Sequence, residues 1–118
     1  MKTVLIADDS SFMRTRIKEI IKQNDYHVIA EAKDGKEAID YFTHYQPDIV
    51  LLDLTMPNVD GIIALRKIME INPNANVIVF SALATKYTMI EAIRSGAKDF
   101  IIKPNFDQLI PTIKKLTD

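Results

Sequence analysis

The chain has 118 residues, of which 47% are hydrophobic and 26% charged, and its formal net charge is −1. These values predict one domain over residues 1–118 that buries about two-thirds of its unfolded surface, and they exclude strong bulk attraction to nucleic acid or anionic membranes. The absence of cysteine excludes disulfides, thiolate catalysis and cysteine-based zinc sites. No apolar stretch approaches the roughly 20 residues of a membrane span. We therefore expect a cytoplasmic protein with no direct contact to nucleic acid or membrane.

Short apolar runs alternate with amphipathic stretches along the chain, which is the pattern of a βα repeat over a parallel sheet. In chain order, the predicted strands are Thr3–Ala7, His27–Ala30, Ile49–Leu52, Val77–Phe80 and Phe100–Ile102. Because the strands are short and the crossovers between them long, we expect right-handed connections. The predicted fold class is α/β, a doubly wound five-stranded parallel sheet of the flavodoxin-like (βα)5 type with strand order 2-1-3-4-5.

The first three predicted helices each carry apolar residues at helical spacing, and a serine can cap the first of them. The first is capped by Ser10 or Ser11, the second begins after Asp34-Gly35, and the third after Asp60-Gly61. Their predicted apolar faces are, in chain order, Phe12, Met13, Ile17, Ile20 and Ile21; then Ala38, Ile39 and Phe42; then Ile62, Leu65, Ile68 and Met69.

Two further helices are predicted in the last third of the chain. The fourth runs from about Thr85 to Ser95 and stops at Gly96, a residue that readily adopts a left-handed cap. The fifth spans roughly 106–116. Pro111 falls inside it and is expected to weaken the first turn or to bend the helix.

Polar residues follow four of the predicted strands, at the point where each strand ends. Asp8 and Asp9 follow the first strand and Asp53 the third, while Ser81 and Lys103 follow the fourth and fifth. In strand order 2-1-3-4-5 the first and third strands are central neighbours, and open α/β sheets bind ligands at this switch point. The three carboxylates should therefore meet there, with the serine and the lysine beside them.

This set of side chains suggests phosphoryl chemistry. Clustered carboxylates repel one another, and a hard divalent ion such as Mg²⁺ relieves that repulsion. A carboxylate can act as a nucleophile toward phosphorus, and phosphoryl transfer mainly requires charge neutralisation, which Mg²⁺ and Lys103 can supply. The set contains no evident base to activate water, which favours a lasting phosphoryl-aspartate.

The five residues and their local sequence resemble the receiver domains of two-component response regulators. The matching segments are Leu5–Ser10, Asp53–Pro57, Asp60–Gly61, Ser81–Ala82 and Gly96–Pro104. Within that family, segments 10–14 and 102–106 are most similar to the single-domain chemotaxis regulators. The resemblance covers essentially the whole chain.

The resemblance implies that Asp53 is the phosphoacceptor. It also implies a Mg²⁺ site, for which Mn²⁺ can substitute, formed by Asp8, Asp9, the Asp53 carboxylate and the main-chain carbonyl of Thr55. Thr55 and Leu83, each two residues beyond a site residue, are at positions that shape water access in this family.

The resemblance further implies that Ser81 hydrogen-bonds the phosphoryl group, that Lys103 pairs with it, and that Phe100 is an aromatic rotamer switch. Two of these residues depart from the commonest forms of the family. Ser81 stands where threonine is frequent, and Phe100 where tyrosine is frequent. Because phenylalanine has no hydroxyl, its inward or outward state should depend on packing alone. We also expect a cis peptide bond between Lys103 and Pro104.

The partners implied are a histidine kinase as phosphodonor, a phosphatase and, for a chemotactic role, a flagellar motor switch protein. We expect no enzyme activity beyond self-phosphorylation and self-dephosphorylation. The expected partner surface covers the fourth helix, the fifth strand and the fifth helix, and its exposed residues are predicted to be Lys86, Tyr87, Glu91, Arg94, Lys98 and Lys114.

Several other functions remain open from the sequence. The chain could be a phosphorelay intermediate, or a receiver from a longer response regulator with a DNA-binding output. A phosphohydrolase of the haloacid dehalogenase type also uses a strand-end aspartate, but Thr55 stands where its second acid belongs. A nucleotide-binding module is disfavoured because none of the three glycines builds a phosphate-binding loop.

Overall fold

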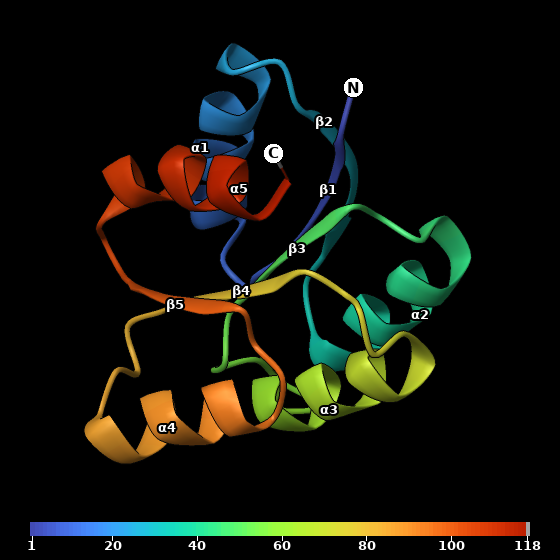
Figure 1. Cartoon of the computed structure of the whole chain (residues 1–118), viewed down its shortest axis with the longest axis vertical. Helices are drawn as coiled ribbons and strands as arrows, with labels where there is room; N and C mark the ends of the chain where they lie inside the picture. Colours follow the sequence, from blue (N-terminus) through green and yellow to red (C-terminus); the bar gives the residue numbers. More distant parts are fainter. Residues whose placement is uncertain (118) are drawn as a thin grey trace.

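The computed structural model describes residues 1–117 as five strands that alternate with five α-helices (Figure 1). The strands are β1 (Thr3–Ala7), β2 (His27–Ala32), β3 (Ile49–Leu52), β4 (Val77–Ser81) and β5 (Asp99–Ile102). The helices are α1 (Ser11–Gln23), α2 (Gly35–Tyr45), α3 (Gly61–Ile71), α4 (Lys86–Arg94), the short 3-10 helix η1 (Phe106–Gln108) and α5 (Leu109–Thr117). No helix among these residues has both the length and the apolar character required to cross a membrane.

All five strands form one parallel sheet in the order β2-β1-β3-β4-β5, which confirms the predicted topology. In the register between the two central strands, Ala7 pairs with Leu52. The last residues of β1 and β3 are therefore side by side, and whatever follows each strand enters the same space.

Helices cover both faces of the sheet, with α1 and α5 on one face and α2, α3 and α4 on the other (Figure 1). Side chains alternate along each strand between these faces. In β1, Val4 and Ile6 pack with Ile17 of α1, whereas Leu5 packs with Leu65 of α3. The sheet therefore lies between two apolar cores, and only its edges are open to solvent.

Four helices begin at a side chain that caps a backbone N–H, as helix N-termini require. Ser10 accepts from the N–H of Met13 at 3.2 Å, so Ser10 rather than Ser11 is the cap of α1. In the same way, the side chains of Asp34, Asp60 and Thr85 accept a backbone N–H at the starts of α2, α3 and α4. Gly96 has a φ of 114° after α4, which confirms it as the predicted left-handed residue.

Several boundaries differ from the prediction by one to three residues. β2 continues to Ala32 because Glu31, which interrupts the apolar pattern, still pairs with Ile6 of β1. β4 and β5 each gain one residue, Ser81 and Asp99. The predicted fifth helix is divided into η1 and α5, and Pro111 lies in the first turn of α5, where its missing N–H has no intrahelical acceptor to lose.

Phe12 does not lie on the buried face of α1, contrary to the prediction. Its side chain is 75% exposed, whereas Ile17 and Ile21 are buried. At about 100° per residue, Phe12 lies roughly 140° from Ile17 and 180° from Ile21 around the helix axis. The apolar pattern therefore contained one residue that helical geometry places on the solvent side.

Candidate functional site

Asp8 and Asp53 lie at the carboxyl edge of the sheet, one residue beyond β1 and β3. Each continues the ladder of its strand by one hydrogen bond, from the N–H of Asp8 to the carbonyl of Ala32 (3.0 Å) and from the N–H of Asp53 to the carbonyl of Ala7 (2.9 Å). Asp8 is 2% exposed and Asp53 3% exposed. Two carboxylates that are nearly removed from water require a positive charge close by.

The exposed carboxylate of Asp9 completes an acidic group with these two. One oxygen from each of Asp8, Asp9 and Asp53 lies within 4.8 Å of the others. Together with the single ammonium of Lys103, three carboxylates leave two negative charges in excess. A divalent cation matches that excess, and hard carboxylate oxygens are the ligands that Mg²⁺ prefers. The residues therefore fit the predicted Mg²⁺ site.

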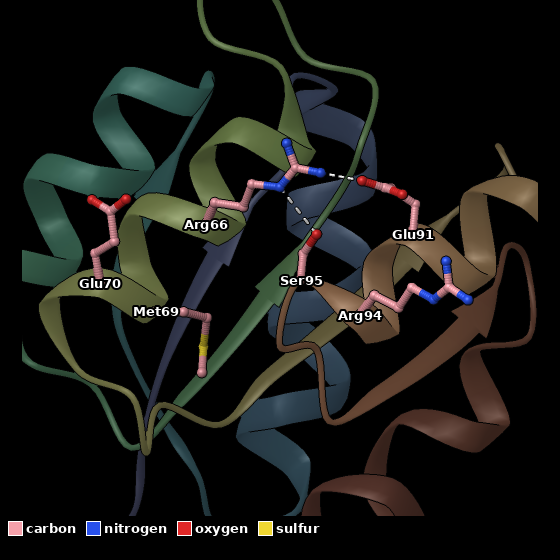
Figure 2. Close-up of a pocket in the computed structure, with 6 residues that line it drawn as sticks. All are labelled: Arg66, Met69, Glu70, Glu91, Arg94 and Ser95. Atoms are coloured by element: carbon pink, nitrogen blue, oxygen red, sulfur yellow. Dashed lines mark hydrogen bonds and ion pairs between the residues drawn. The ribbon is translucent and has the colours of Figure 1, made fainter.

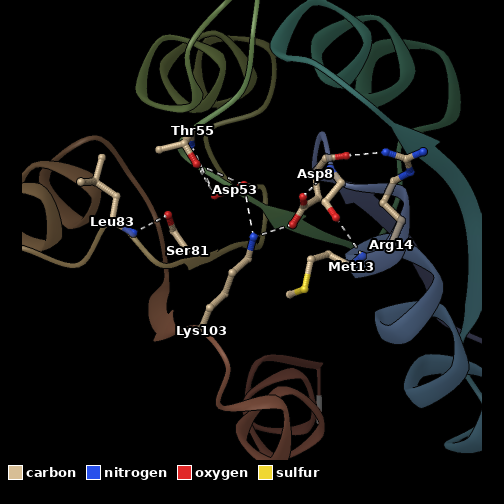
Figure 3. A network of polar contacts seen from close by, with 9 residues as sticks. Asp8, Met13, Arg14, Asp53, Thr55, Ser81, Leu83 and Lys103 are labelled. Carbon is tan, nitrogen blue, oxygen red and sulfur yellow. Dashed lines mark hydrogen bonds and ion pairs between the residues drawn. The ribbon is translucent and has the colours of Figure 1, made fainter.

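Lys103 reaches across the site from the end of β5. Its Nζ atom lies 2.7 Å from Asp8 Oδ2 and 3.2 Å from Asp53 Oδ2 (Figure 3). Burial alone lowers the pKa of this lysine, but the hydrogen bond to Asp8 and the charge of Asp53 outweigh burial, so the pKa lies above its ordinary value. The ammonium therefore stays charged near neutral pH. The Lys103–Pro104 peptide bond is cis, as predicted.

Thr55 and Ser81 supply hydroxyl groups beside Asp53 (Figure 3). Thr55 donates its N–H to Asp53 Oδ1 at 3.3 Å, and its hydroxyl lies 3.4 Å from both carboxylate oxygens. Ser81 is fully buried, and its Oγ accepts the N–H of Leu83 at 3.1 Å. Because that bond occupies only an acceptor position, the Ser81 hydroxyl proton remains available for a ligand.

The loop after Asp53 is held by contacts that the sequence does not predict. The buried Asp34 receives the N–H of Glu37 at 2.8 Å and the side-chain amide of Asn58 at 2.7 Å. At the other end of the loop, the N–H of Gly61 donates to the carbonyl of Leu54 at 3.0 Å. Asp34-Gly35 could be recognised in the sequence as a helix start, but no local pattern linked it to a residue 24 positions away.

Phe100 is half-buried and packs against the core beneath α2, α3 and α4. Of the residues predicted to be exposed on the partner surface, five are exposed: Lys86, Tyr87, Arg94, Lys98 and Lys114. Glu91 is not, contrary to the prediction, because its carboxylate turns toward α3 and pairs with Arg66.

A pocket of about 370 Å³ opens between the loop after Asp53 and the start of α4. The residues that line this pocket include Thr55, Leu83 and Tyr87 of α4. Residues next to Asp53 and Ser81 therefore line the same pocket as the first turn of α4.

A parallel α/β sheet with an acidic cluster and a lysine at its switch point defines a receiver-type protein, and comparison with known families agrees. The profile of the response regulator receiver domain matches residues 4–114. The chain belongs to this family.

Single-domain chemotaxis proteins are among its relatives. It is 50% identical over 103 residues to the chemotaxis protein CheY of Thermotoga maritima, a match that covers 87% of this chain and 86% of the relative. It is 47% identical over 116 residues to CheY of Listeria monocytogenes, with 98% of both chains covered. The solved complex of CheX and CheY with BeF₃ and Mg²⁺ from Borrelia burgdorferi matches with a TM-score of 0.92 at 38% identity, covering 99% of this chain and 90% of that one.

Proposed function

We propose that residues 1–118 form one receiver domain that acts as a phosphorylation-dependent switch, accepting a phosphoryl group on Asp53 from a histidine kinase. The observation that carries the proposal is the environment of the Asp53 carboxylate. It is 3% exposed, it lies 3.2 Å from the ammonium of Lys103, and it belongs to an acidic group that fits Mg²⁺. The relatives named CheY favour a role in chemotaxis.

In the proposed transfer, one carboxylate oxygen of Asp53 bonds to phosphorus while the bond from phosphorus to the imidazole nitrogen of the donor breaks. The electron pair of that bond stays on the nitrogen. Lys103 faces the negative charge of the phosphoryl oxygens, and the Ser81 hydroxyl can donate to one of them. Asp8, Asp9, Asp53 and the Thr55 carbonyl would hold Mg²⁺ or Mn²⁺, which when bound supplies further positive charge. We propose no activity beyond this self-phosphorylation and the loss of the phosphoryl group.

Phosphorylation is proposed to act on Phe100 through Ser81. The Ser81 hydroxyl is held by the N–H of Leu83, and its movement toward a phosphoryl group would give up that bond and change the loop before α4. Phe100 pairs with Val79 in the neighbouring strand and is half-buried, so its ring can respond to space opened near β4. The ligand shifts the equilibrium between two ring positions only by its difference in affinity for them.

The proposed partner surface is the face formed by α4, β5 and α5. Three large apolar side chains are exposed there, with Tyr87 at 76%, Ile93 at 50% and Ile102 at 40%. Exposed aromatic and apolar residues next to charged ones are typical of protein-binding surfaces. A flagellar motor switch protein is the partner we propose for a chemotactic role. The solved complex of CheX with CheY favours a CheX-like protein as a further partner.

Labelling with acetyl phosphate tests the phosphoacceptor. Intact mass should rise by one phosphoryl group in the wild type only when Mg²⁺ or Mn²⁺ is present, and Asp53→Asn should remain unlabelled. Equal labelling of both proteins would remove Asp53 from this role. Beryllofluoride, which stands in for the phosphoryl group, should shift the NMR signals of Phe100 more in the wild type than in Ser81→Ala.

The partner surface is tested by the affinity for a motor switch protein with and without beryllofluoride. Activation should tighten binding, and Tyr87→Ala should remove most of that gain while Asp53 labelling persists. Tyr45→Ala is the matched control, because Tyr45 is a tyrosine of α2 that is also exposed (42%). If activation changes no affinity, the motor role is wrong. A phosphorelay role or a DNA-binding output then becomes the favoured function, and the chain is still a receiver domain. A phosphatase partner and a cytoplasmic location stay predictions.

A further inference from the structure

We propose that Arg14 is a positioning residue for the metal-binding loop, an inference that rests on the proposed function of that loop. The side chain of Arg14 projects from α1 toward the end of β1 and is 18% exposed. Its Nη1 atom donates to the main-chain carbonyl of Asp8 at 2.7 Å (Figure 3). The guanidinium therefore contacts the loop through its backbone.

The carbonyl that Arg14 binds belongs to the peptide joining Asp8 to Asp9. The N–H of Asp8 still belongs to the β-ladder, through its bond to Ala32, but its carbonyl lies beyond the last paired residue of β1. The side chain of Asp8 is also held, because its Oδ1 atom accepts the N–H of Ser10 at 2.9 Å. The bond from Arg14 thus fixes the plane of a peptide that has a proposed metal ligand on each side.

Arg14 is itself held in place by Glu31 of β2. The Nε atom of Arg14 lies 3.4 Å from one oxygen of Glu31, and Lys18 Nζ lies 3.1 Å from the other. A planar guanidinium can bind two acceptors in fixed directions, which an ammonium cannot do. Glu31 orients the donor and offsets its charge, so α1, β2 and the loop after β1 are joined at one side chain.

Two physical effects of Arg14 on the metal site have opposite signs. As a positive charge near a cation site, Arg14 weakens Mg²⁺ binding by repulsion, so its removal would strengthen binding. As a residue that orients the Asp8–Asp9 peptide, it favours binding, so its removal would weaken it. Residues that orient metal ligands typically contribute tenfold or more to metal affinity. We infer that orientation dominates, because the guanidinium contacts a carbonyl and its charge is shared with Glu31.

The test is a Mg²⁺ titration of the full chain, followed by the NMR signals of residues 8–10. Arg14→Met removes both the charge and the donor, and the Kd for Mg²⁺ should rise by about tenfold. Lys18→Met is the matched control. Like Arg14, Lys18 is a positively charged residue of α1 that pairs with Glu31, but it has no hydrogen bond to Asp8 among the described residues. The Kd of Lys18→Met for Mg²⁺ should therefore stay level or fall. Saturating Mg²⁺ should restore acetyl phosphate labelling of Arg14→Met to the wild-type rate.

An unchanged or lower Kd in folded Arg14→Met would overturn the positioning role. If that variant does not fold, Arg14→Lys decides the question. It keeps the charge but cannot hold the two acceptors together, so a smaller rise in Kd is expected, and a wild-type Kd contradicts the proposal. Failure of the wild type to bind Mg²⁺ would instead overturn the proposed site.

Discussion

α3 and α4 lie on the same face of the sheet, yet they are attached to it very differently (Figure 1). α3 buries four residues, Gly61, Ala64, Leu65 and Ile68. α4 buries only Ala92, although each of the two helices leaves two isoleucines exposed. Because buried apolar area is the main source of packing energy, α3 belongs to the fixed framework, whereas α4 can shift at little cost.

The loops that lead into the two helices show the same contrast. The loop before α3 is tied to α2 by the bond between Asn58 and Asp34, and it ends with Gly61 packed under Leu54. In the loop before α4, the side-chain hydrogen bonds of the described residues stay local: Leu83 donates to Ser81 and Thr88 to Thr85. The segment that follows Asp53 is thus tied to a second helix, whereas the segment that follows Ser81 is held by local side-chain bonds.

A polar link also joins the two helices. Arg66 of α3 pairs with Glu91 and donates to Ser95 Oγ at 3.2 Å (Figure 2). These residues line an open pocket of about 510 Å³. A partly exposed ion pair contributes only about 0–1 kcal/mol, which suits a helix that carries the proposed partner surface.

Truncation of a buried leucine gives the largest expected difference between the helices. Leu65→Ala in α3 should lower the free energy of unfolding by about 2–5 kcal/mol, because it leaves a cavity in the core. Ile93→Ala in α4 should lower it by no more than about 0.5 kcal/mol. Urea denaturation measures both, and similar losses at the two positions would refute the contrast.

A methyl group at the start of α3 should be the next most disruptive change. The Cβ of Gly61→Ala would lie 2.3 Å from Leu54 Cα and 2.5 Å from the carbonyl oxygen of Asp53. Overpacking of this kind costs about 1–3 kcal/mol, and the loop after Asp53 must shift, so labelling of Asp53 should fall as well. Gly96→Ala, at the end of α4, strains only its own backbone and a flexible methionine. It should lose some stability but keep full labelling.

Breaking the link between the helices should have a small effect on stability and a specific effect on α4. Arg66→Met should cost about 0–1 kcal/mol and speed amide hydrogen exchange in α4 while that of α3 stays unchanged. Lys67→Met is the control, since Lys67 pairs within α3, with Glu70. Equal exchange rates in both variants would show that the link does not restrain α4.

The smallest expected effect is a pH dependence of the anchor before α3. The N–H of Glu37 lowers the pKa of Asp34 most strongly, burial opposes this, and the Asn58 amide lowers it further. A carboxyl whose pKa is lower in the folded state stabilises the fold above its unfolded pKa of about 3.9, and this contribution disappears as the pH falls through the folded value. Asp34→Asn, which can still cap α2, should be less stable than the wild type at pH 7. The difference in melting temperature between the wild type and Asp34→Asn should become smaller below about pH 4. A difference that does not change with pH would contradict the lowered pKa of Asp34.

By itself, the sequence determined the strand order, the approximate starts of the helices and the residues at the strand ends. These features depend on local rules. Period-two and period-3.6 apolar patterns place each element, and parallel strands deliver whatever follows them to one edge of the sheet. Asp8, Asp53 and Lys103 could therefore be predicted to meet before any distance was known.

Only the tertiary structure decided which long-range partners hold those residues in place. The bonds from Arg14 to Asp8 and from Asn58 to Asp34, and the inward turn of Glu91, join residues on different elements, and no periodic pattern records such a pairing. Phe12 shows the reverse case: it was predicted on the apolar face of the first helix, but it faces solvent because the helix rotates it away from the core. Side chains that act between elements depend on how the elements pack, and packing is a property of the whole fold.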